Sequence, residues 1–560
     1  MSNPVRNGHA VRGIEAAAKA LALSVECYAV GDGEGARRLA GALEQPTDTR
    51  PERLDGRGPD AARAALGAAA AGRRTALIVS GAGVYDALPA LRQMCQAAVP
   101  VLLVIPSHGD DVGSTHPEPG LDDLIPLLGM HVGVLVASDA TQVGDLVLVA
   151  LRAASDRGAP WAVAFELGHV GLALSNGVLA DPDVVHSWTS GLARASDGGE
   201  RPVAREHDAG SYQRSSERFG FALGAAMRDL ERSVRRSYAP VIATGVHDPD
   251  VVLIAAGHAA RTARHAANMP GRHGHHVSAM QVVSLRPFPA ADIVRASWRA
   301  RAILVHEAHP EPLGIGGTLS DAVRAAFADA LTWHPGYTGI GRIPPVVTVV
   351  GHDVTAAQWL SAIELVATAA DPPRLIVARP RTEASVTPDV TLELAMDEAQ
   401  RETTLQLVIE WLARAGREIW AHSHEPTHTM LSFDRETGAS GPGHVLLALA
   451  GGAFDPARLE TLPSGSVAVL AGDFSDRVLA DSIRVGALRG IRVVGLPGNS
   501  SGPSRAPEPT VAAAIAVLGG QETVDSSELR AVAVDRLGRE SDSFVSQVRA
   551  RIEALRPHLG

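Results

Sequence analysis

Short runs of apolar residues, separated by segments with helical character, recur through the first third of this chain. The runs are Thr75–Ser80, Val99–Ile105, Val132–Ala137 and Trp161–Phe165. Continuous apolar runs of this length are typical of parallel strands that are covered on both faces. An alanine-rich segment such as Gly13–Leu23 favours a helix. Strands and helices that alternate in this way predict a doubly wound α/β sheet.

The same alternation returns twice further along the chain. A second α/β unit begins at Val251–Gly257 and continues through Ala302–Val305, and a third begins at Leu392 with strands near His444–Ala450 and Ser466–Ala471. Polar stretches rich in glycine, arginine or proline separate these units, as expected of linkers. We therefore predict three doubly wound α/β domains, divided into a first domain (1–195), a linker with a connecting helix (196–240), a second domain (241–345), a connecting segment (346–387) and a third domain (388–560).

The composition excludes several classes of protein. The chain has 560 residues, of which 46% are hydrophobic and 20% are charged, and its 62 acidic residues exceed its 51 basic ones. This acidic balance argues against a dedicated nucleic-acid binder. No run of 18 uncharged apolar residues occurs, and Met1–Val11 lacks the apolar region of a signal peptide. We therefore expect a cytoplasmic protein with no membrane insertion.

The counts of lysine and cysteine exclude two kinds of chemistry. Lys19 is the only lysine, and it does not follow a glycine-rich loop. A Walker A loop requires such a lysine, so P-loop nucleotide hydrolysis is excluded. Cys27 and Cys95 are the only cysteines. Because an iron–sulfur cluster usually takes four cysteine thiolates, we expect the chain alone to hold none.

Ser107–His116 is a polar loop directly after the apolar run that ends at Ile105. It contains His108, Asp110 and Asp111. Open α/β sheets bind ligands in crevices outside the carboxyl ends of their strands, so these three side chains are candidate catalytic residues. The alternative is a solvated loop in which aspartate stabilises the turns.

Gly31–Gly35 is a glycine-rich turn between a predicted strand and a predicted helix. It is either an anion-binding turn at a helix N-terminus or a simple connection. Its two acidic residues favour the connection, because they would repel a phosphate group.

Three histidine clusters raise the question of a metal site, but none has the HExxH or paired CxxC spacing of a known metal motif. They are His273–His276, His306–His309 and His422–His428. Zinc and iron sites need three or four converging ligands in fixed geometry. We therefore predict no metal site in this chain.

From Val251 onward the sequence resembles the second domain of the pyruvate and 2-oxoacid:ferredoxin oxidoreductases. Three pieces carry the likeness: Val251–Gly257, then Val282–Pro289 with its LRPFP motif, then Ala302–Glu307. Pro345–Ser361 resembles the segment that closes this domain. Residues 1–190 are similar to the family's pyrimidine-binding thiamine diphosphate domain, and those from about 388 onward resemble its gamma domain more faintly.

The resemblance implies a fused alpha and gamma chain of a 2-oxoacid:ferredoxin oxidoreductase, with a transketolase C-terminal-like second domain. Such an enzyme decarboxylates a 2-oxoacid oxidatively and passes the electrons to iron–sulfur clusters on a partner chain. Thiamine diphosphate with Mg²⁺ would lie at an interface with a beta-type thiamine-binding subunit in a hetero-oligomer. A ferredoxin or iron–sulfur subunit would accept the electrons, and the use of coenzyme A is left open. The residues implied to bind the cofactor are Gly31, Ser80, Gly81 and Gly83.

Three positions depart from the family pattern. Tyr28–Asp32 replaces a YPxTP loop without its prolines and threonine, Gly58 replaces the glutamate that protonates the cofactor, and Asp397–Arg401 replaces a glycine-rich loop. A shifted alignment would offer other acids in place of Gly58: Glu52, Asp55 or Asp60. These departures leave two alternatives. One is a non-catalytic scaffold subunit that has lost thiamine binding, and the other is a transketolase-like or dehydrogenase E1-beta type subunit.

Overall fold

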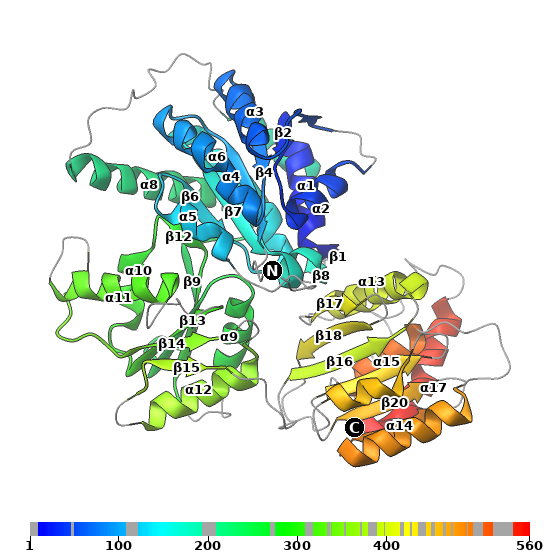
Figure 1. The fold of residues 1–560 in the computed structure, drawn as a ribbon. Coiled ribbons are helices and arrows are strands. Elements are labelled where there is room, and N and C mark those ends of the chain that lie inside the picture. The colour runs from blue at the N-terminus through cyan, green and yellow to red at the C-terminus, as the bar shows by residue number, and fades with distance from the viewer. Residues whose placement is uncertain are drawn as a thin grey trace. The chain divides into compact units, whose positions relative to one another are not determined.

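The chain forms three β-sheets, and helices pack against each of them (Figure 1). Two of the sheets lie in one unit, Gly13–Gly171 with Leu179–Arg379, and the third lies in a second unit, Met1–Arg12 with Leu172–Val178 and Pro380–Gly560. The computed structural model describes these residues: 9–45, 50–107, 121–192, 209–268, 275–308, 317–332, 337, 339–351, 354–369, 372–378, 389–396, 398–414, 419–425, 428–434, 444–449, 454–462, 466–471, 474–489, 491–496, 508–518 and 541–559.

The first sheet has seven strands in the order β12-β6-β7-β5-β4-β2-β3, and all except β12 are parallel. Helices α1, α2 and α6 form one packed group, and α3 packs against α4. The strands are β2 (Cys27–Val30), β3 (Glu52–Arg53), β4 (Thr75–Ile78), β5 (Leu102–Ser107), β6 (Gly133–Val136), β7 (Trp161–Glu166) and β12 (Ser284–Arg286). The helices are α1 (Gly13–Ser24), α2 (Glu34–Leu43), α3 (Pro59–Ala70), α4 (Ala82–Gln96), η2 (Asp122–Leu124), α5 (Ile125–Leu128), α6 (Ala140–Arg157), the π-helix η3 (Leu167–Leu172), α7 (Pro182–Ser190) and α8 (Ala209–Val234).

The second sheet has six strands in the order β15-β14-β13-β10-β11-β9, with β9 antiparallel to β11. Because β11 and β13 lie on opposite sides of β10, the chain reverses its direction of winding beside β10. The elements are β9 (Val241–Gly245), β10 (Val251–Ala255), α9 (Ala259–Ala267), β11 (Val277–Val282), α10 (Ala290–Ser297), β13 (Ala302–Glu307), α11 (Thr318–Leu331), β14 (Val346–Val350), α12 (Ala356–Thr368) and β15 (Leu375–Val377).

The third sheet has eight strands in the order β1-β8-β17-β18-β16-β19-β20-β21. Its first two strands come from the N-terminal part of the chain, β1 (His9–Arg12) and β8 (Leu174–Gly177). Both segments were predicted to belong to the first domain, so their pairing with the C-terminal strands differs from the prediction. The remaining elements are β16 (Asp389–Ala395), α13 (Glu398–Arg414), β17 (Ile419–Glu425), β18 (His428–Asp434), β19 (His444–Leu449), η4 (Pro456–Thr461), β20 (Val467–Ala471), α14 (Asp476–Arg489), β21 (Arg492–Leu496), α15 (Glu508–Leu518) and α17 (Ser541–Leu559).

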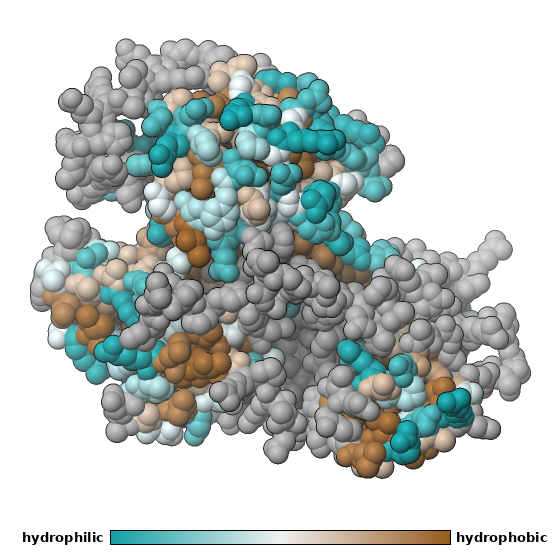
Figure 2. Space-filling view, in the orientation of Figure 1, coloured by the Kyte–Doolittle hydropathy of each residue, from teal (hydrophilic) through white to brown (hydrophobic). Residues whose placement is uncertain are grey.

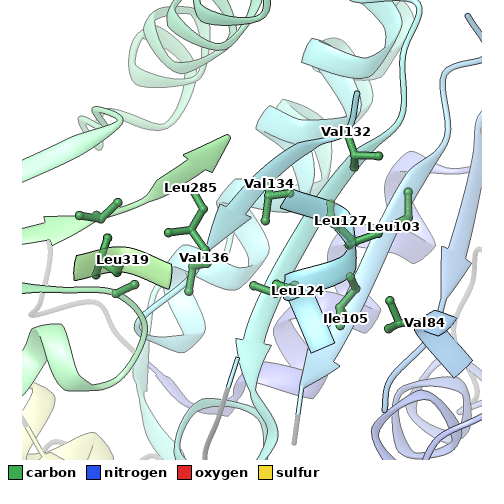
Figure 3. Packing of buried hydrophobic residues seen from close by; sticks show 14 of the residues in the cluster. Val84, Leu103, Ile105, Leu124, Leu127, Val132, Val134, Val136, Leu285 and Leu319 are labelled. Carbon is green, nitrogen blue, oxygen red and sulfur yellow. The ribbon is translucent and has the colours of Figure 1, made fainter. Parts of the chain in front are cut away.

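Small aliphatic side chains build the core of the unit that holds the first two sheets (Figure 3). One cluster of buried residues runs from the first sheet into the second sheet and its helix α11. Both faces of the parallel strands are buried, which explains why their sequences are apolar at nearly every position. Figure 3 labels ten members of the cluster: Val84, Leu103, Ile105, Leu124, Leu127, Val132, Val134, Val136, Leu285 and Leu319.

The predicted α/β fold with doubly wound domains is confirmed. The four apolar runs of the first domain form β4 to β7, and the alanine-rich segment at the start forms α1. The domain boundaries drawn from composition stay predictions. Among the described residues, no helix has the length and apolar character needed to cross a membrane.

The surface in Figure 2 carries hydrophilic residues over α2 and α3, where arginines pair with acidic neighbours. Hydrophobic residues gather over α14, where Ile483 and Leu488 are 59% and 78% exposed.

Candidate functional site

Two loops meet at the carboxyl edge of the first sheet. Strand β2 is followed by Gly31–Gly35, and its parallel neighbour β4 is followed by the turn Ser80–Gly83. Because neighbouring parallel strands end at the same edge, the two loops come together there. The four residues predicted to bind the cofactor, Gly31, Ser80, Gly81 and Gly83, therefore lie on these two neighbouring loops.

The two loops touch through their backbones. The N–H of Ser80 donates to the carbonyl oxygen of Asp32 at 3.2 Å. A Cβ atom at Gly83 would clash with that same carbonyl, and one at Gly33, where φ is +116°, would clash with Ser80. Only glycine permits so close an approach and tolerates this positive φ. The glycines therefore hold the two loops against each other.

At each of the two helix N-termini at this edge, one backbone N–H already has a partner within the chain. The N–H of Gly81, at the start of α4, donates to the Asp123 carboxylate at 2.8 Å, and Asp123 is only 2% exposed. At the start of α2, the N–H of Ala36 donates to the Ser80 hydroxyl at 3.1 Å. An anion at either terminus would need such donors. These contacts favour the connecting-turn interpretation of Gly31–Gly35.

The position that the resemblance gives to the catalytic acid, Gly58, lies beside Asp32. Gly58 precedes α3 with φ 50° and ψ −128°, a conformation that favours glycine strongly. A Cβ atom placed there would lie 3.3 Å from Oδ2 of Asp32. The backbone therefore disfavours a side chain at position 58, and a carboxylate from the neighbouring loop stands next to it. Neither Asp32 nor the buried Asp123 was predicted to be a site residue.

The three catalytic candidates, His108, Asp110 and Asp111, lie outside the described residues. Ser107, the residue before them, is buried at the end of β5. In the parts of the chain that the structure describes, no group of three histidine, cysteine, aspartate or glutamate side chains is arranged to hold a metal ion. The described members of the histidine clusters include His306, whose Nε2 lies 2.8 Å from the carbonyl oxygen of Gly351.

A second group of buried polar side chains lies where the first two sheets meet. Glu166 ends β7, and its carboxylate accepts a hydrogen bond from the backbone N–H of His258, just before α9. The rings of His258 and His169 stack with centroids 4.4 Å apart. Arg261, in the first turn of α9, is also buried. Sequence reasoning missed this group because its members come from distant segments.

Glu307 plays a comparable role on the second sheet. It ends β13, and its carboxylate accepts a hydrogen bond from the N–H of Ser320 at 2.6 Å, at the start of α11. Burial raises the pKa of Glu307 from about 4.5 to about 7, although the hydrogen bonds from Ser320 act in the opposite direction. This carboxyl group therefore titrates near neutral pH.

Two kinds of similarity to known proteins are found, one in the sequence of the second sheet's region and one in the fold. Residues 249–344 match the family model for pyruvate:ferredoxin oxidoreductase core domain II. The structure is similar to that of the 2-oxoglutarate:ferredoxin oxidoreductase from Magnetococcus marinus with 2-oxoglutarate, coenzyme A and succinyl-CoA bound. That match has a TM-score of 0.50 and 17% identity, and it covers 64% of this chain and 65% of that one.

A split gene transketolase, an inactive beta4 tetramer, also matches, with a TM-score of 0.39, 16% identity and coverage of 63% of this chain and 97% of that one. No curated protein is similar enough in sequence to match the chain. The chain spans 65% of the length of the Magnetococcus protein, and at 17% identity that likeness shows the fold alone.

The fold is thus that of α/β proteins built like the 2-oxoacid:ferredoxin oxidoreductases. Residues 249–344 match that family's core domain II, and this match is what relates the chain to the 2-oxoacid:ferredoxin oxidoreductases. The resemblance predicted from the sequence is confirmed for residues 249–344.

Thiamine diphosphate, which the family implies, has two halves with different needs. A pyrimidine nitrogen pairs with a carboxyl group, and Asp32 offers one beside Gly58. A diphosphate needs a cation or free N–H donors. The N–H groups of Gly81 and Ala36 are engaged, and the described residues hold no cluster suited to a metal ion. Among the described residues, Asp32 therefore suits the pyrimidine half, and the N–H groups of Gly81 and Ala36 are not available to a diphosphate.

Proposed function

We propose that the chain is a subunit of a thiamine diphosphate-dependent 2-oxoacid:ferredoxin oxidoreductase. In this proposal it provides the pyrimidine side of the cofactor site, and the complex decarboxylates a 2-oxoacid oxidatively. The observation that carries the proposal is the core domain II match at residues 249–344, in the same unit as a parallel sheet with a carboxylate at its loop edge. The identity of the 2-oxoacid and the use of coenzyme A are outside the proposal.

The proposal requires a partner for the diphosphate and for the electrons. The engaged N–H groups of Gly81 and Ala36 are the reason to place the diphosphate and Mg²⁺ on a beta-type chain. The chain has two cysteines, which is too few for an iron–sulfur cluster. Cys27 is buried, and burial raises the pKa of Cys95 to about 11, so both thiols are poor metal ligands. The clusters therefore belong to a further subunit or a ferredoxin.

The test is to isolate the full-length, tagged chain from its native source and analyse what accompanies it. We expect a second chain that contains thiamine, stoichiometric iron in the complex, and reduction of a low-potential dye that depends on an added 2-oxoacid. The chain expressed alone should contain no iron and reduce no dye. Isolation without a thiamine-containing partner, or iron bound by the chain alone, would refute the proposal.

A second candidate is a scaffold subunit that has lost the catalytic site. The glycine-only backbone at position 58 favours it, since that position cannot easily carry the expected acid. The same isolation separates the two candidates. A scaffold would assemble with its partner but bind no thiamine diphosphate at this interface, whereas a catalytic subunit would be needed for both binding and turnover.

A further inference from the structure

The backbone of Asp32 is held in place by the neighbouring loop. Its carbonyl oxygen accepts the Ser80 N–H and lies against the Cα of Gly83, in a space too small for a Cβ atom. The preceding residue, Gly31, donates its N–H to the carbonyl of Ile78 at 2.9 Å, which continues the pairing of β2 with β4. The backbone of Asp32 therefore has a fixed position at the edge of the sheet. A fixed backbone is what a side chain needs if it is to hold a precise position against a reacting group.

The Asp32 carboxylate reaches across the edge toward the start of α3. Its Oδ2 lies 3.3 Å from the place where a Cβ atom of residue 58 would be. The Asp32 side chain is exposed, and among the described residues it has no hydrogen-bond partner. The backbone of Asp32 is thus held in place, and its carboxylate is accessible to a ligand.

Three other acids near this edge already have partners. Glu52 pairs with Arg73 at 2.6 Å, and Asp60 pairs with Arg63 at 2.6 Å. The buried Asp123 binds the Gly81 N–H at the start of α4. Asp55, on the loop before Gly58, is exposed as well, but its carboxylate does not come within 4 Å of the Cβ position of residue 58, whereas Oδ2 of Asp32 does. Asp32 is thus the described acid whose carboxylate stands beside position 58.

We propose that Asp32 is the carboxylic acid that contacts the pyrimidine ring, in place of a side chain at position 58. This inference rests on the proposed function. The Asp32 carboxyl group gives its proton to a ring nitrogen, N–H forms as O–H breaks, and the proton returns along the same hydrogen bond, so no other reactant is needed. General acid–base contributions of this kind are worth roughly 10²–10⁴-fold in rate.

The experiment uses the native complex, loaded with thiamine diphosphate and without 2-oxoacid. The exchange of the cofactor's acidic thiazolium C2 proton with D₂O is followed by NMR after rapid acid quenching, and cofactor affinity is measured by calorimetry. In Asp32→Asn we expect exchange to slow by about 100-fold or more, with affinity within about threefold, because asparagine keeps the shape but not the proton. Asp32→Glu should restore exchange to within about tenfold of the wild type.

Asp86→Asn is the matched control, since Asp86 is an exposed aspartate on α4 that is not part of the proposed site. It should leave exchange and affinity unchanged. Normal exchange in Asp32→Asn, or slow exchange in Asp55→Asn or Asp60→Asn instead, would overturn the role of Asp32 while leaving the proposed function intact. A native complex that binds no thiamine diphosphate would overturn the proposed function, and the inference with it. Slow exchange that Asp32→Glu does not restore would also count against an acid at this position.

Discussion

The carboxylate of Glu166 accepts a hydrogen bond of 2.6 Å from the backbone N–H of His258 and so ties the first sheet to the second. Glu166 ends β7, whereas His258 stands at the start of α9 on the other sheet. Gly257, at φ +60°, makes room for this contact, since a Cβ atom there would lie 2.5 Å from Oε2 of Glu166. A negative side chain at a helix N-terminus is also favoured by the helix dipole. One buried carboxylate therefore fixes where α9 begins.

Glu166→Ala should lower the stability of the chain by about 1.5–3 kcal/mol, the usual range for a hydrogen bond to a charged group. The variant leaves the His258 N–H buried without this acceptor. Thermal unfolding of the full chain measures the change. Glu231→Ala, at an exposed position on α8, is the control and should stay within about 0.5 kcal/mol. An equal effect of the two substitutions would contradict the role given to Glu166.

Glu307 should make stability depend on pH between about 4.5 and 7. Burial raises its pKa to about 7 in the folded state, so the folded chain binds this proton more tightly than the unfolded chain. The contribution is fully present below the unfolded pKa of about 4.5 and is lost as the pH rises through about 7. The full difference is up to about 3 kcal/mol.

Glu307→Gln keeps an oxygen for the Ser320 N–H and removes the titration. Relative to wild type, this variant should therefore gain stability at pH 8 compared with pH 5, as measured by denaturant unfolding at both values. Glu231→Gln serves as the exposed control, with no such change. A pH-independent difference between wild type and Glu307→Gln would show that Glu307 does not titrate in this range.

Arg236 and Asp145 form a buried ion pair whose disruption should be costly. Arg236 donates two hydrogen bonds to Asp145, at 2.6 and 2.7 Å, and Tyr238 adds a third. Arg236→Ala leaves a buried carboxylate without its cation, which typically costs about 3–5 kcal/mol. Adding Asp145→Asn to this variant should recover part of the loss. Arg232→Ala, which breaks an exposed pair with Asp229, should cost at most about 1 kcal/mol in the same unfolding assay.

Leu174 should matter to the third sheet although it lies far from that sheet's other residues in sequence. It belongs to β8, is 2% exposed and packs in the same cluster as Leu392 and Val445. Leu174→Ala should cost about 2–5 kcal/mol and speed hydrogen exchange in β16 and β19. Exchange in β4 and β5 should change little. Leu103→Ala, in the core of the first sheet, should give the reverse pattern, and matching patterns would contradict the division of the core.

Local sequence patterns predicted most of the strands and helices. The run at Thr75–Ser80 is buried on both faces, so nearly every position had to be apolar, and β4 could be read directly. The same holds for Val251–Gly257, which became β10. Such patterns indicate that a segment is buried on both faces. They can be recognised without knowing which strand lies alongside.

Pairings between strands that are distant in the sequence could not be predicted from local patterns. β1 and β8 are only four residues each, and their local pattern does not indicate that they join a sheet whose other strands begin at Asp389. The residues of the candidate site likewise differ in how far the sequence indicates them. Gly31 and the Ser80–Gly83 turn were singled out because they follow strands, whereas the position of the Asp32 carboxylate beside Gly58 is visible only in the structure. A side chain's partner across 26 residues is set by backbone geometry, which the sequence alone does not display.

The place of β1 and β8 in the third sheet has a consequence for how this polypeptide is made and how its gene can be divided. The ribosome produces two of the eight strands before residue 180 and supplies their neighbour β17 only after residue 418. The complete sheet can therefore form only late in synthesis, because it combines strands translated early with strands translated near the end. A gene break that released residues 388–560 as a separate polypeptide would leave β1 and β8 on the other product. Residues 388–560 alone therefore lack two strands of their own sheet and do not form a self-contained domain.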